Sequence, residues 1–244
     1  MATLDRCHQC LQRLSVKKHG LLIAVSTMQR LTREGQKVFF IENVNSRLEV
    51  ALYAPAGRVR DIVVLCHPHP LFGGCMDDPI LNSCAEYFEG ADKVVARLNF
   101  RGVGGSSGSS GRLHAWETPL DSGNQPEIND LILLCGWLQQ KYGNKPLSLI
   151  GYSFGAQVVW SSLPLLTFTR AICIAPPTKF MEFVKHGQTL SNRVLCVVCK
   201  GDPFFNRHTF DELGCQNLVM LSGGDHFFSN QKGALLDAIG AWLS

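Results

Sequence analysis

The sequence predicts an α/β protein with one mostly parallel central sheet and helices on both faces. Short apolar runs alternate with helical patterns along most of the 244 residues. Several runs, such as DIVVLC, are apolar throughout, as expected for strands that are buried on both faces. The length is sufficient for a single domain of this type.

The expected elements follow in chain order. Residues 37–43 and 47–55 read as two strands of an N-terminal hairpin that is joined by a short turn. Further strands are expected at 61–66, 93–100, 146–152, 171–177, 193–202 and 216–224. Helices are expected at about 79–88, at 127–142, from Phe154 onward and at 234–243. A long loop rich in Gly and Ser follows the strand 93–100.

Charge divides the chain into a basic N-terminal extension, residues 1–35, and a domain, residues 36–244. The extension has six Lys and Arg residues and two acidic ones, whereas the net charge of the whole chain is +3. The domain is therefore close to neutral, which argues against a nucleic-acid-binding face. We expect a cytoplasmic protein without a membrane span, or a mitochondrial one if residues 1–35 are a transit peptide.

The cysteine pattern favours a reduced, intracellular protein. Several of the ten cysteines fall in apolar strand-like runs, where Cys acts as a small hydrophobic residue. Cys7 and Cys10 have zinc-site spacing but lack a second pair of ligands. We therefore expect no metal ion and no cofactor.

Two serines match the pattern Gly-x-Ser-x-Gly, and their surroundings distinguish them. Ser153 lies where the strand 146–152 turns directly into a helix, and Gly151 and Gly155 allow the sharp turn that would expose its hydroxyl. Ser106 is followed by more Ser and Gly and by no helix, so it is interpreted as a flexible loop serine. Ser153 is the candidate nucleophile.

A serine nucleophile requires a base and an acid, which follow it in the order Ser, acid, His in this arrangement. Of the histidines after Ser153, only His226 follows a strand end, whereas His186 and His208 are interpreted as surface residues. Asp202 ends the strand 193–202 and is the candidate acid, in preference to Asp225, which adjoins His226.

The donors of an oxyanion hole are expected on two backbone segments. One is the N–H of Phe154, directly after the nucleophile. The other should come from the loop HPHPLFGG after the strand 61–66, where His69 is the donor between two prolines. The imidazoles of His67 and His69 are interpreted as parts of a rigid loop wall rather than as metal ligands.

Four motifs resemble those of the α/β-hydrolase superfamily. They are HPHPLFGGCMD (67–77), RGVGGSS (101–107), GYSFG (151–155) and DHFF (225–228). More closely, they are similar to small hydrolases without a large cap, of the dienelactone-hydrolase-like and serine-aminopeptidase-like kinds. The resemblance implies an α/β-hydrolase fold with Ser153, Asp202 and His226 as the triad, and it makes the loop around Ser106 a wall near the site.

We therefore expect a serine hydrolase that cleaves an ester, thioester or amide of a small-molecule acyl substrate. The alternative is a catalytically inactive binding or scaffold protein on the same fold, which an incomplete triad would favour. The crossover at 177–192 is too short for a large lid, so an open site is expected, which suits a small polar acyl compound or a chain end more than a buried lipid. The sequence leaves open whether the chain forms a homodimer.

Overall fold

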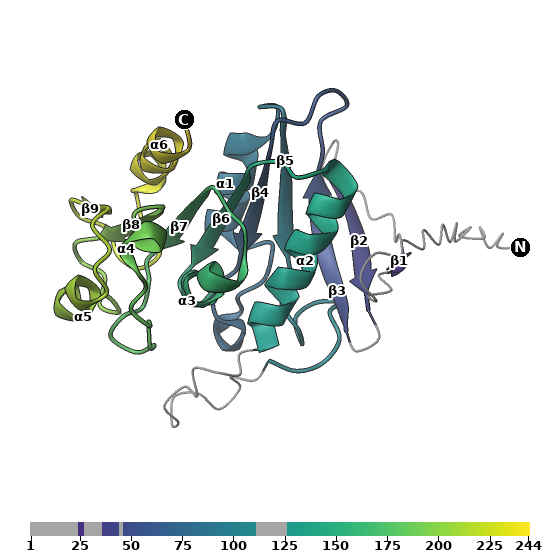
Figure 1. Cartoon of the computed structure of the whole chain (residues 1–244). Coiled ribbons are helices and arrows are strands. Elements are labelled where there is room, and N and C mark those ends of the chain that lie inside the picture. The colour runs from purple at the N-terminus through teal and green to yellow at the C-terminus, as the bar shows by residue number, and fades with distance from the viewer. Residues whose placement is uncertain (1–23, 27–35, 44–45, 111–125) are drawn as a thin grey trace, which may run out of the picture.

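The computed structural model describes residues 24–26, 36–43, 46–110 and 126–244 (Figure 1). The predicted transit peptide and the Cys7–Cys10 pair lie outside these residues. Of the predicted extension, the structure describes only β1 (Ala24–Ser26), which pairs antiparallel with β2. This short strand was not expected from the sequence.

A single sheet runs through the described residues in the order β1-β2-β3-β5-β4-β6-β7-β8-β9. The pairs β1–β2, β2–β3 and β3–β5 are antiparallel. All the other neighbouring pairs, from β5–β4 to β8–β9, are parallel. The predicted hairpin is β2 (Gln36–Glu42) and β3 (Arg47–Tyr53). The other strands are β4 (Asp61–Cys66), β5 (Lys93–Leu98), β6 (Leu147–Tyr152), β7 (Arg170–Ile174), β8 (Val194–Cys199) and β9 (Leu218–Leu221).

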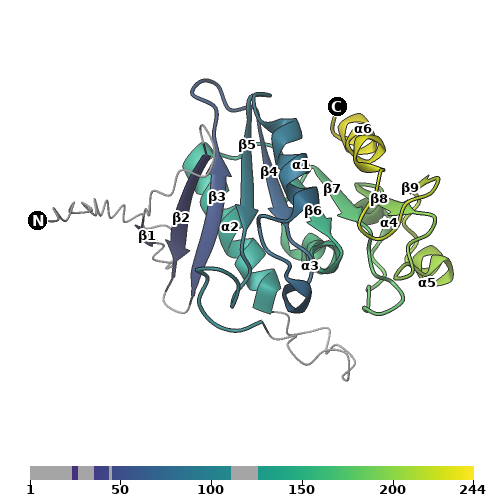
Figure 2. The ribbon, with the colours of Figure 1, turned by 180° about the vertical axis from the view of Figure 1, so that it is seen from behind.

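Helices cover both faces of the sheet, as predicted. The helices α2 (Pro126–Tyr142) and α3 (Phe154–Ser162) pack on one face, and α1 (Pro79–Phe88) and α6 (Lys232–Leu243) pack on the other (Figures 1 and 2). The short helices are α4 (Gln188–Ser191), α5 (Arg207–Glu212), η1 (Pro70–Phe72) and η2 (Leu163–Leu165).

Each central strand contributes side chains to both cores. In β4, Ile62 and Val64 belong to the core under α2 and α3, while Val63 and Leu65 belong to the core under α1 and α6. This alternation explains why the strand is apolar throughout, because both of its faces are covered. The predicted α/β fold class is therefore confirmed.

The sheet places a candidate site between β4 and β6. The chain leaves β4 toward β5 on one side, and the strands from β6 to β9 continue on the other side. At such a reversal of strand order, the connections at the carboxyl ends diverge and leave a crevice for a ligand. The loops that carry the predicted site residues begin at the carboxyl ends of β4, β6, β8 and β9.

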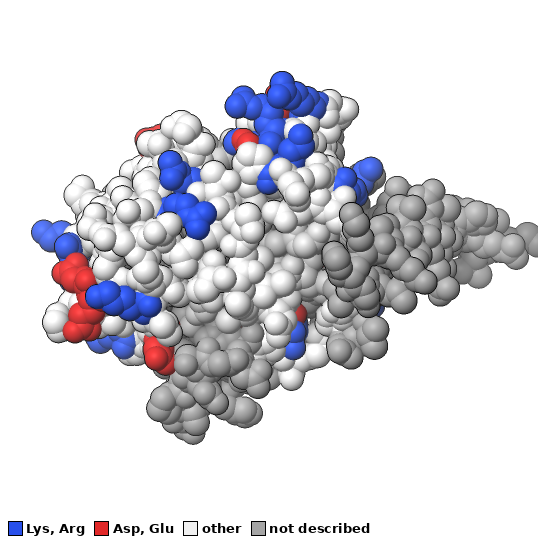
Figure 3. Space-filling model, viewed as in Figure 1, with Lys and Arg blue, Asp and Glu red and all other residues white. Residues whose placement is uncertain are grey.

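Three surface and composition features bear on the sequence-based expectations. All eight cysteines of the described residues are free thiols. Within the described ranges, no helix is long and apolar enough to cross a membrane. Over the face shown in Figure 3 most side chains are uncharged; one group of Lys and Arg lies at its upper edge, and others lie beside Asp and Glu at its left edge.

Two helical glycines provide a matched test of the packing of α3. A Cβ on Gly136 in α2 would meet nothing within 4 Å, whereas a Cβ on Gly155 in α3 would lie 2.2 Å from the carbonyl oxygen of Cys66. We expect Gly136→Ala to raise the free energy of unfolding by about 0.5–1 kcal/mol. Gly155→Ala should lower it by at least about 2 kcal/mol, since a backbone atom must move. Urea unfolding of both variants measures this; equal effects would contradict it.

Candidate active site

Ser153 occupies a strained turn between β6 and α3. Its backbone has φ 54° and ψ −113°, an unfavourable conformation for a residue with a side chain. The turn is held by the Ser153 N–H, which donates to the Ile174 carbonyl at 2.8 Å. A Cβ on Gly151 would lie 2.1 Å from the Gly155 carbonyl oxygen, so the two glycines of the motif permit the strand and the helix to touch.

The side chains of Ser153, His226 and Asp202 form one hydrogen-bonded chain. The distance from His226 Nε2 to Ser153 Oγ is 2.9 Å, and the distance from His226 Nδ1 to Asp202 Oδ2 is also 2.9 Å. The Asp202 side chain is fully buried and that of His226 nearly so. The structure thus brings together all three residues that the sequence predicts as a triad.

Asp202 is held by backbone contacts after β8. Its second carboxylate oxygen, Oδ1, accepts from the Phe204 N–H at 2.8 Å, so both oxygens have a partner. The loops after β8 and β9 also touch, because a Cβ on Gly201 would lie 2.7 Å from the Gly224 carbonyl oxygen. This close contact brings the acid and the base within reach although 24 residues separate them.

His226 is positioned from its own backbone as well. The Tyr152 hydroxyl donates to the His226 carbonyl at 3.0 Å, and burial raises the pKa of Tyr152, so that the phenol stays protonated. Asp225, the competing acid, turns away and accepts from the N–H and hydroxyl of Ser229. These hydrogen bonds lower the pKa of Asp225. Asp202, not Asp225, faces the imidazole.

The two other downstream histidines lie away from this chain of hydrogen bonds. The His186 ring stacks on Trp160, with ring centroids 5.1 Å apart, and its Nε2 is 2.9 Å from the Trp160 carbonyl. The His208 side chain is 86% exposed on α5. Neither contacts Ser153, so His226 is the histidine that the structure places at the serine.

The loop after β4 brings the predicted oxyanion residues together. The His69 and Phe154 rings are in contact, with centroids 5.0 Å apart. The loop is closed on itself: the Gly74 N–H donates to the His69 carbonyl at 3.1 Å, and His69 Nδ1 accepts from the Leu71 N–H at 3.1 Å. The loop after β4 therefore lies beside the first residue of α3, while the role of the His69 and Phe154 N–H groups as donors stays a prediction.

His67 is a buried neutral histidine that joins the ends of β4 and β5. Its Nε2 accepts from the Phe100 N–H at 3.1 Å, and its Nδ1 lies 2.6 Å from the Pro68 carbonyl. Because a peptide N–H can only donate, Nδ1 must carry the proton that Pro68 accepts. Burial lowers the pKa of His67 to about 4. Among the described residues, no cluster of three or more His, Cys, Asp or Glu side chains could hold a metal ion.

Arg97 and Asn99 hold the far end of the same loop, a role that the sequence reasoning missed. Arg97 Nη1 donates to the Met76 carbonyl at 2.9 Å and also contacts the Asn82 amide oxygen. The Met76 N–H donates to Asn99 Oδ1 at 2.8 Å, and Asn99 Nδ2 donates to Glu49 at 2.8 Å. Polar residues inside the apolar strand run KVVARLNF were the available signal.

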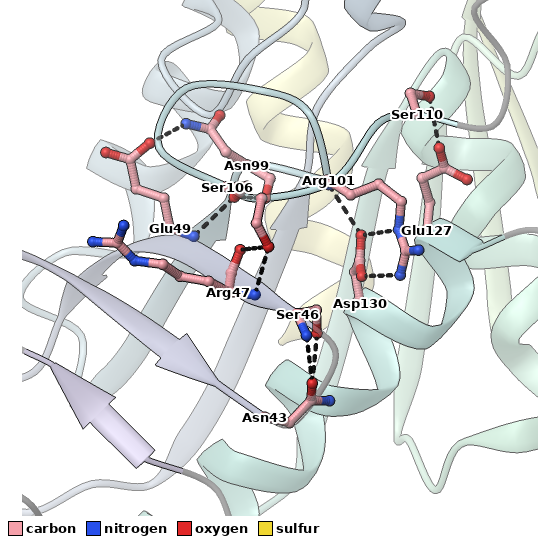
Figure 4. Close-up of polar contacts among 11 residues, drawn as sticks. Asn43, Ser46, Arg47, Glu49, Asn99, Arg101, Ser106, Ser110, Glu127 and Asp130 are labelled. Carbon is pink, nitrogen blue, oxygen red and sulfur yellow. Dashed lines mark hydrogen bonds and ion pairs between the residues drawn. The ribbon is translucent and has the colours of Figure 1, made fainter.

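Ser106 is a buried structural serine, which corrects its interpretation as flexible. Its hydroxyl accepts from the Glu49 N–H at 2.8 Å and donates to the Asn99 carbonyl at 2.7 Å (Figure 4). Only 7% of Ser106 is exposed. The hydroxyl therefore ties the loop to β3 through Glu49, far away in the sequence, and to the end of β5 through Asn99.

Residues on both sides of Ser106 fix the same loop to α2. The Arg101 guanidinium pairs with both carboxylate oxygens of Asp130, at 3.1 and 2.6 Å, and the Ser110 hydroxyl donates to Glu127 at 2.6 Å (Figure 4). Burial raises the pKa of Asp130, while the hydrogen bonds from Arg101 oppose the shift. The described part of the Gly/Ser-rich loop is thus anchored on two sides.

The buried imidazole predicts a pH-dependent stability. Because the pKa of His67 is about 4 in the folded state and 6.5 ordinarily, the unfolded chain takes up the proton first as the pH falls. The free energy of unfolding should therefore fall by about 2 kcal/mol between pH 7 and pH 5 on account of His67. Urea unfolding at both pH values should show a smaller difference for His67→Gln than for the wild type.

His208→Gln, at an exposed position, is the control for this experiment and should leave the pH difference unchanged. An NMR titration of the His67 ring tests the same shift if His67→Gln does not fold. An undiminished pH difference in folded His67→Gln, or a ring pKa near 6.5, would show that the buried neutral histidine is not responsible.

The structural role of Ser106, the rival serine, predicts an effect on stability. Ser106→Ala leaves the Glu49 N–H without its acceptor, so we expect the free energy of unfolding to fall by about 2 kcal/mol. Ser109 is exposed and lies in the same loop, so Ser109→Ala should change the free energy of unfolding by less than about 0.5 kcal/mol. Thermal or urea unfolding of both variants measures the difference, and equal stabilities would argue against the structural role.

No protein-family model matches the chain. An uncharacterized protein of Rickettsia prowazekii is 33% identical over 199 residues, which cover 75% of this chain and 78% of that protein.

Solved structures extend the comparison to the fold. An α/β serine hydrolase homologue from Coxiella burnetii is 25% identical with a TM-score of 0.69, covering 85% of this chain and 97% of that one. An α/β serine hydrolase without a lid from Xanthomonas campestris is 24% identical with a TM-score of 0.71, covering 88% and 96%. Together with the sheet order and the turn at Ser153, these similarities show that the chain belongs to the α/β-hydrolase superfamily.

Proposed function

We propose that this protein is a serine hydrolase that cleaves an ester, thioester or amide bond through an acyl-enzyme. The observation that carries the proposal is the hydrogen-bonded chain from Asp202 through His226 to Ser153, with both links at 2.9 Å. These distances fall in the range over which a base can take the proton of a nucleophile. The strained turn at Ser153 presents the hydroxyl at the carboxyl end of β6.

In the first half of the reaction, Ser153 Oγ attacks the carbonyl carbon while His226 Nε2 takes the hydroxyl proton. The bond to the leaving group then breaks, and the imidazolium returns the proton to the departing atom, which leaves Ser153 acylated. In the second half, His226 takes a proton from water, and the hydroxide attacks the acyl group. The attack forms a second tetrahedral intermediate. Its collapse releases the acid, and the His226 imidazolium returns the proton to Ser153 Oγ.

Asp202 acts on the base rather than on the substrate. Its Oδ2 accepts from Nδ1 of His226, which leaves Nε2 free of a proton and directed at Ser153. The buried carboxylate also stabilises the imidazolium that forms during the attack. Since Asp202 Oδ1 is held by the Phe204 N–H, the carboxylate has little freedom to leave this position.

The peptide N–H groups of Phe154 and His69 are the proposed donors to the tetrahedral oxyanion. Phe154 is the first residue of α3, so its peptide group lies at the positive end of the helix dipole. Losing one such donor typically costs about 3–4 kcal/mol of transition-state stabilisation. The contact between the His69 and Phe154 rings supports the placement of both peptide groups on one side of Ser153.

The similarity to α/β serine hydrolase homologues supports the same class of reaction. The alternative of an inactive binding or scaffold protein rests on an incomplete triad, and the three hydrogen-bonded side chains favour a catalyst instead. Esters, thioesters and amides all react through the same tetrahedral intermediate, so the triad by itself accommodates each of them.

A fluorophosphonate probe tests the proposal without a known substrate. The purified protein should be labelled at Ser153, as mapped by mass spectrometry, because the probe reacts with serines that a base activates. Ser153→Ala should give no label, and His226→Ala should lose it. Asp202→Asn should label more slowly by about 10³–10⁴-fold, since the imidazole would adopt the wrong tautomer.

Ser106→Ala is the matched control, because it removes the rival serine and should leave the label on Ser153. Circular dichroism of each variant establishes that it is folded. A folded wild-type protein that takes no label, or a label that persists in Ser153→Ala, would refute the proposed mechanism.

A further inference from the structure

Exposed apolar side chains are concentrated around the candidate triad. Among the described residues, eight large apolar side chains are exposed: Leu71, Phe72, Tyr87, Leu165, Phe180, Val184, Met220 and Phe227. Leu71, Phe72, Phe180 and Phe227 lie on the loops after β4, β7 and β9, at the carboxyl edge of the sheet. Exposed apolar surface that gathers at one place marks a site of interaction.

Two of these residues, Phe180 and Phe227, are linked to His226 by ring contacts that also include the half-buried Phe204, and we call Phe180, Phe204 and Phe227 the aromatic patch. The Phe204 ring meets the His226 imidazole edge-on, with centroids 4.5 Å apart, and Phe227 does so at 5.7 Å. Phe180 extends the surface outward, with its ring 5.5 Å from that of Phe204. Phe180 and Phe227 are 48% and 66% exposed.

The patch is fixed to the catalytic groups by backbone contacts. Phe204 follows β8 and its N–H donates to Asp202 at 2.8 Å, while Phe227 directly follows His226. The Phe227 N–H is held by the Asp225 carboxylate at 3.0 Å. The positions of these rings are therefore set by the same loops that set the acid and the base.

The chemistry of His226 decides which part of a substrate would touch this surface. In acyl-enzyme formation, the bond from the carbonyl carbon to the leaving oxygen, sulfur or nitrogen breaks, and His226 Nε2 gives that atom its proton. The leaving atom must then lie within hydrogen-bonding distance of Nε2. The group attached to it comes next to the rings that surround the imidazole. The substrate carbonyl would instead face the proposed oxyanion donors, on the side where the Phe72 and His69 ring centroids are 5.6 Å apart.

We propose that the aromatic patch binds the leaving group, so that the substrates are esters, thioesters or amides whose alcohol, thiol or amine portion is hydrophobic. This inference rests on the proposed function and adds the substrate class. It differs from the sequence-based expectation of a small polar compound, which considered only the openness of the site. The Lys179 ammonium lies over the Phe180 ring, 5.4 Å from its centroid, so a charged group stands beside the patch at Phe180.

Two ester series that share methyl acetate test the assignment. In the first, n-alkyl acetates from methyl to hexyl lengthen the leaving group, and their alcohols differ little in basicity. In the second, methyl esters from acetate to heptanoate lengthen the acyl group. We expect kcat/KM to rise about twofold per methylene along the first series, half of the effect of full burial, because the patch is open on one side. Along the second series the rise should be clearly smaller.

Variants of the patch assign the effect to its residues. Phe227→Ser and Phe180→Ser should each lower the ratio of kcat/KM for hexyl acetate to that for methyl acetate by about threefold. Leu165→Ser, an equally exposed apolar residue after α3 and away from the triad, should leave this ratio unchanged. Phe72→Ser is the nearer control on the oxyanion side and should change the ratio much less than Phe227→Ser does.

The outcomes separate this inference from the proposed function. If fluorophosphonate labels Ser153, three results would overturn this inference alone. They are a flat alkyl acetate series, an acyl series that is steeper than the alkyl series, and no measurable turnover of either series. An equal loss in Phe72→Ser and Phe227→Ser would overturn it as well. Absence of both labelling and Ser153-dependent hydrolysis would overturn the proposed function and this inference with it.

Discussion

The close contact between the backbone of α3 and the carboxyl ends of β4 and β6 is the constraint on which the site depends. A Cβ at Gly155 would lie 2.2 Å from the Cys66 carbonyl oxygen, and one at Gly151 would lie 2.1 Å from the Gly155 carbonyl oxygen. The helix can therefore begin immediately after the strand, with Ser153 alone forming the turn. If the helix stood farther from the sheet, the serine hydroxyl would not meet the imidazole from β9.

Small residues beneath α3 extend this contact across the sheet. Cys66, Gly151, Cys173 and Cys196 are paired in register from β4 to β8, so they form one row at the level of the turn. The Cys173 thiol donates to the Ala156 carbonyl at 3.6 Å, in the first turn of α3. Thiols here fill the space that larger side chains would take from the helix, and this explains free cysteines in strand interiors better than a redox role does.

A second level of organisation comes from polar groups that link loops rather than face a ligand. His67 joins the ends of β4 and β5, and Asn99 joins the loop after β4 to β3. Each linking group is buried and pairs with peptide groups, so its loss would leave unsatisfied polar atoms in a region of low dielectric. These hydrogen bonds hold the loops after β4 and β5, whereas Asp202 and His226 are held by contacts of the loops after β8 and β9.

Local pattern determined much of what the sequence could predict. The strand and helix positions, the parallel fold class and the turn at Ser153 follow from apolar runs, from Gly spacing and from the change of period at Phe154, all of which are properties of neighbouring residues. The sequence also predicts the triad from the order Ser153, Asp202, His226, each at a different strand end, because parallel strands bring their carboxyl ends to one edge. The interpretation of Ser106 as flexible is wrong, because its hydroxyl accepts from the N–H of Glu49 on β3, a residue far away in the sequence.

Only the tertiary structure decided the contacts that join distant segments. The sequence could not show that His67 is buried and neutral, or that Phe204 and Phe227 contact the His226 imidazole while Phe180 packs on Phe204. The physical reason is that hydrogen bonds and ring contacts depend on positions a few ångströms apart in space. Those positions are set by how loops from different strands pack against one another, which no local pattern records.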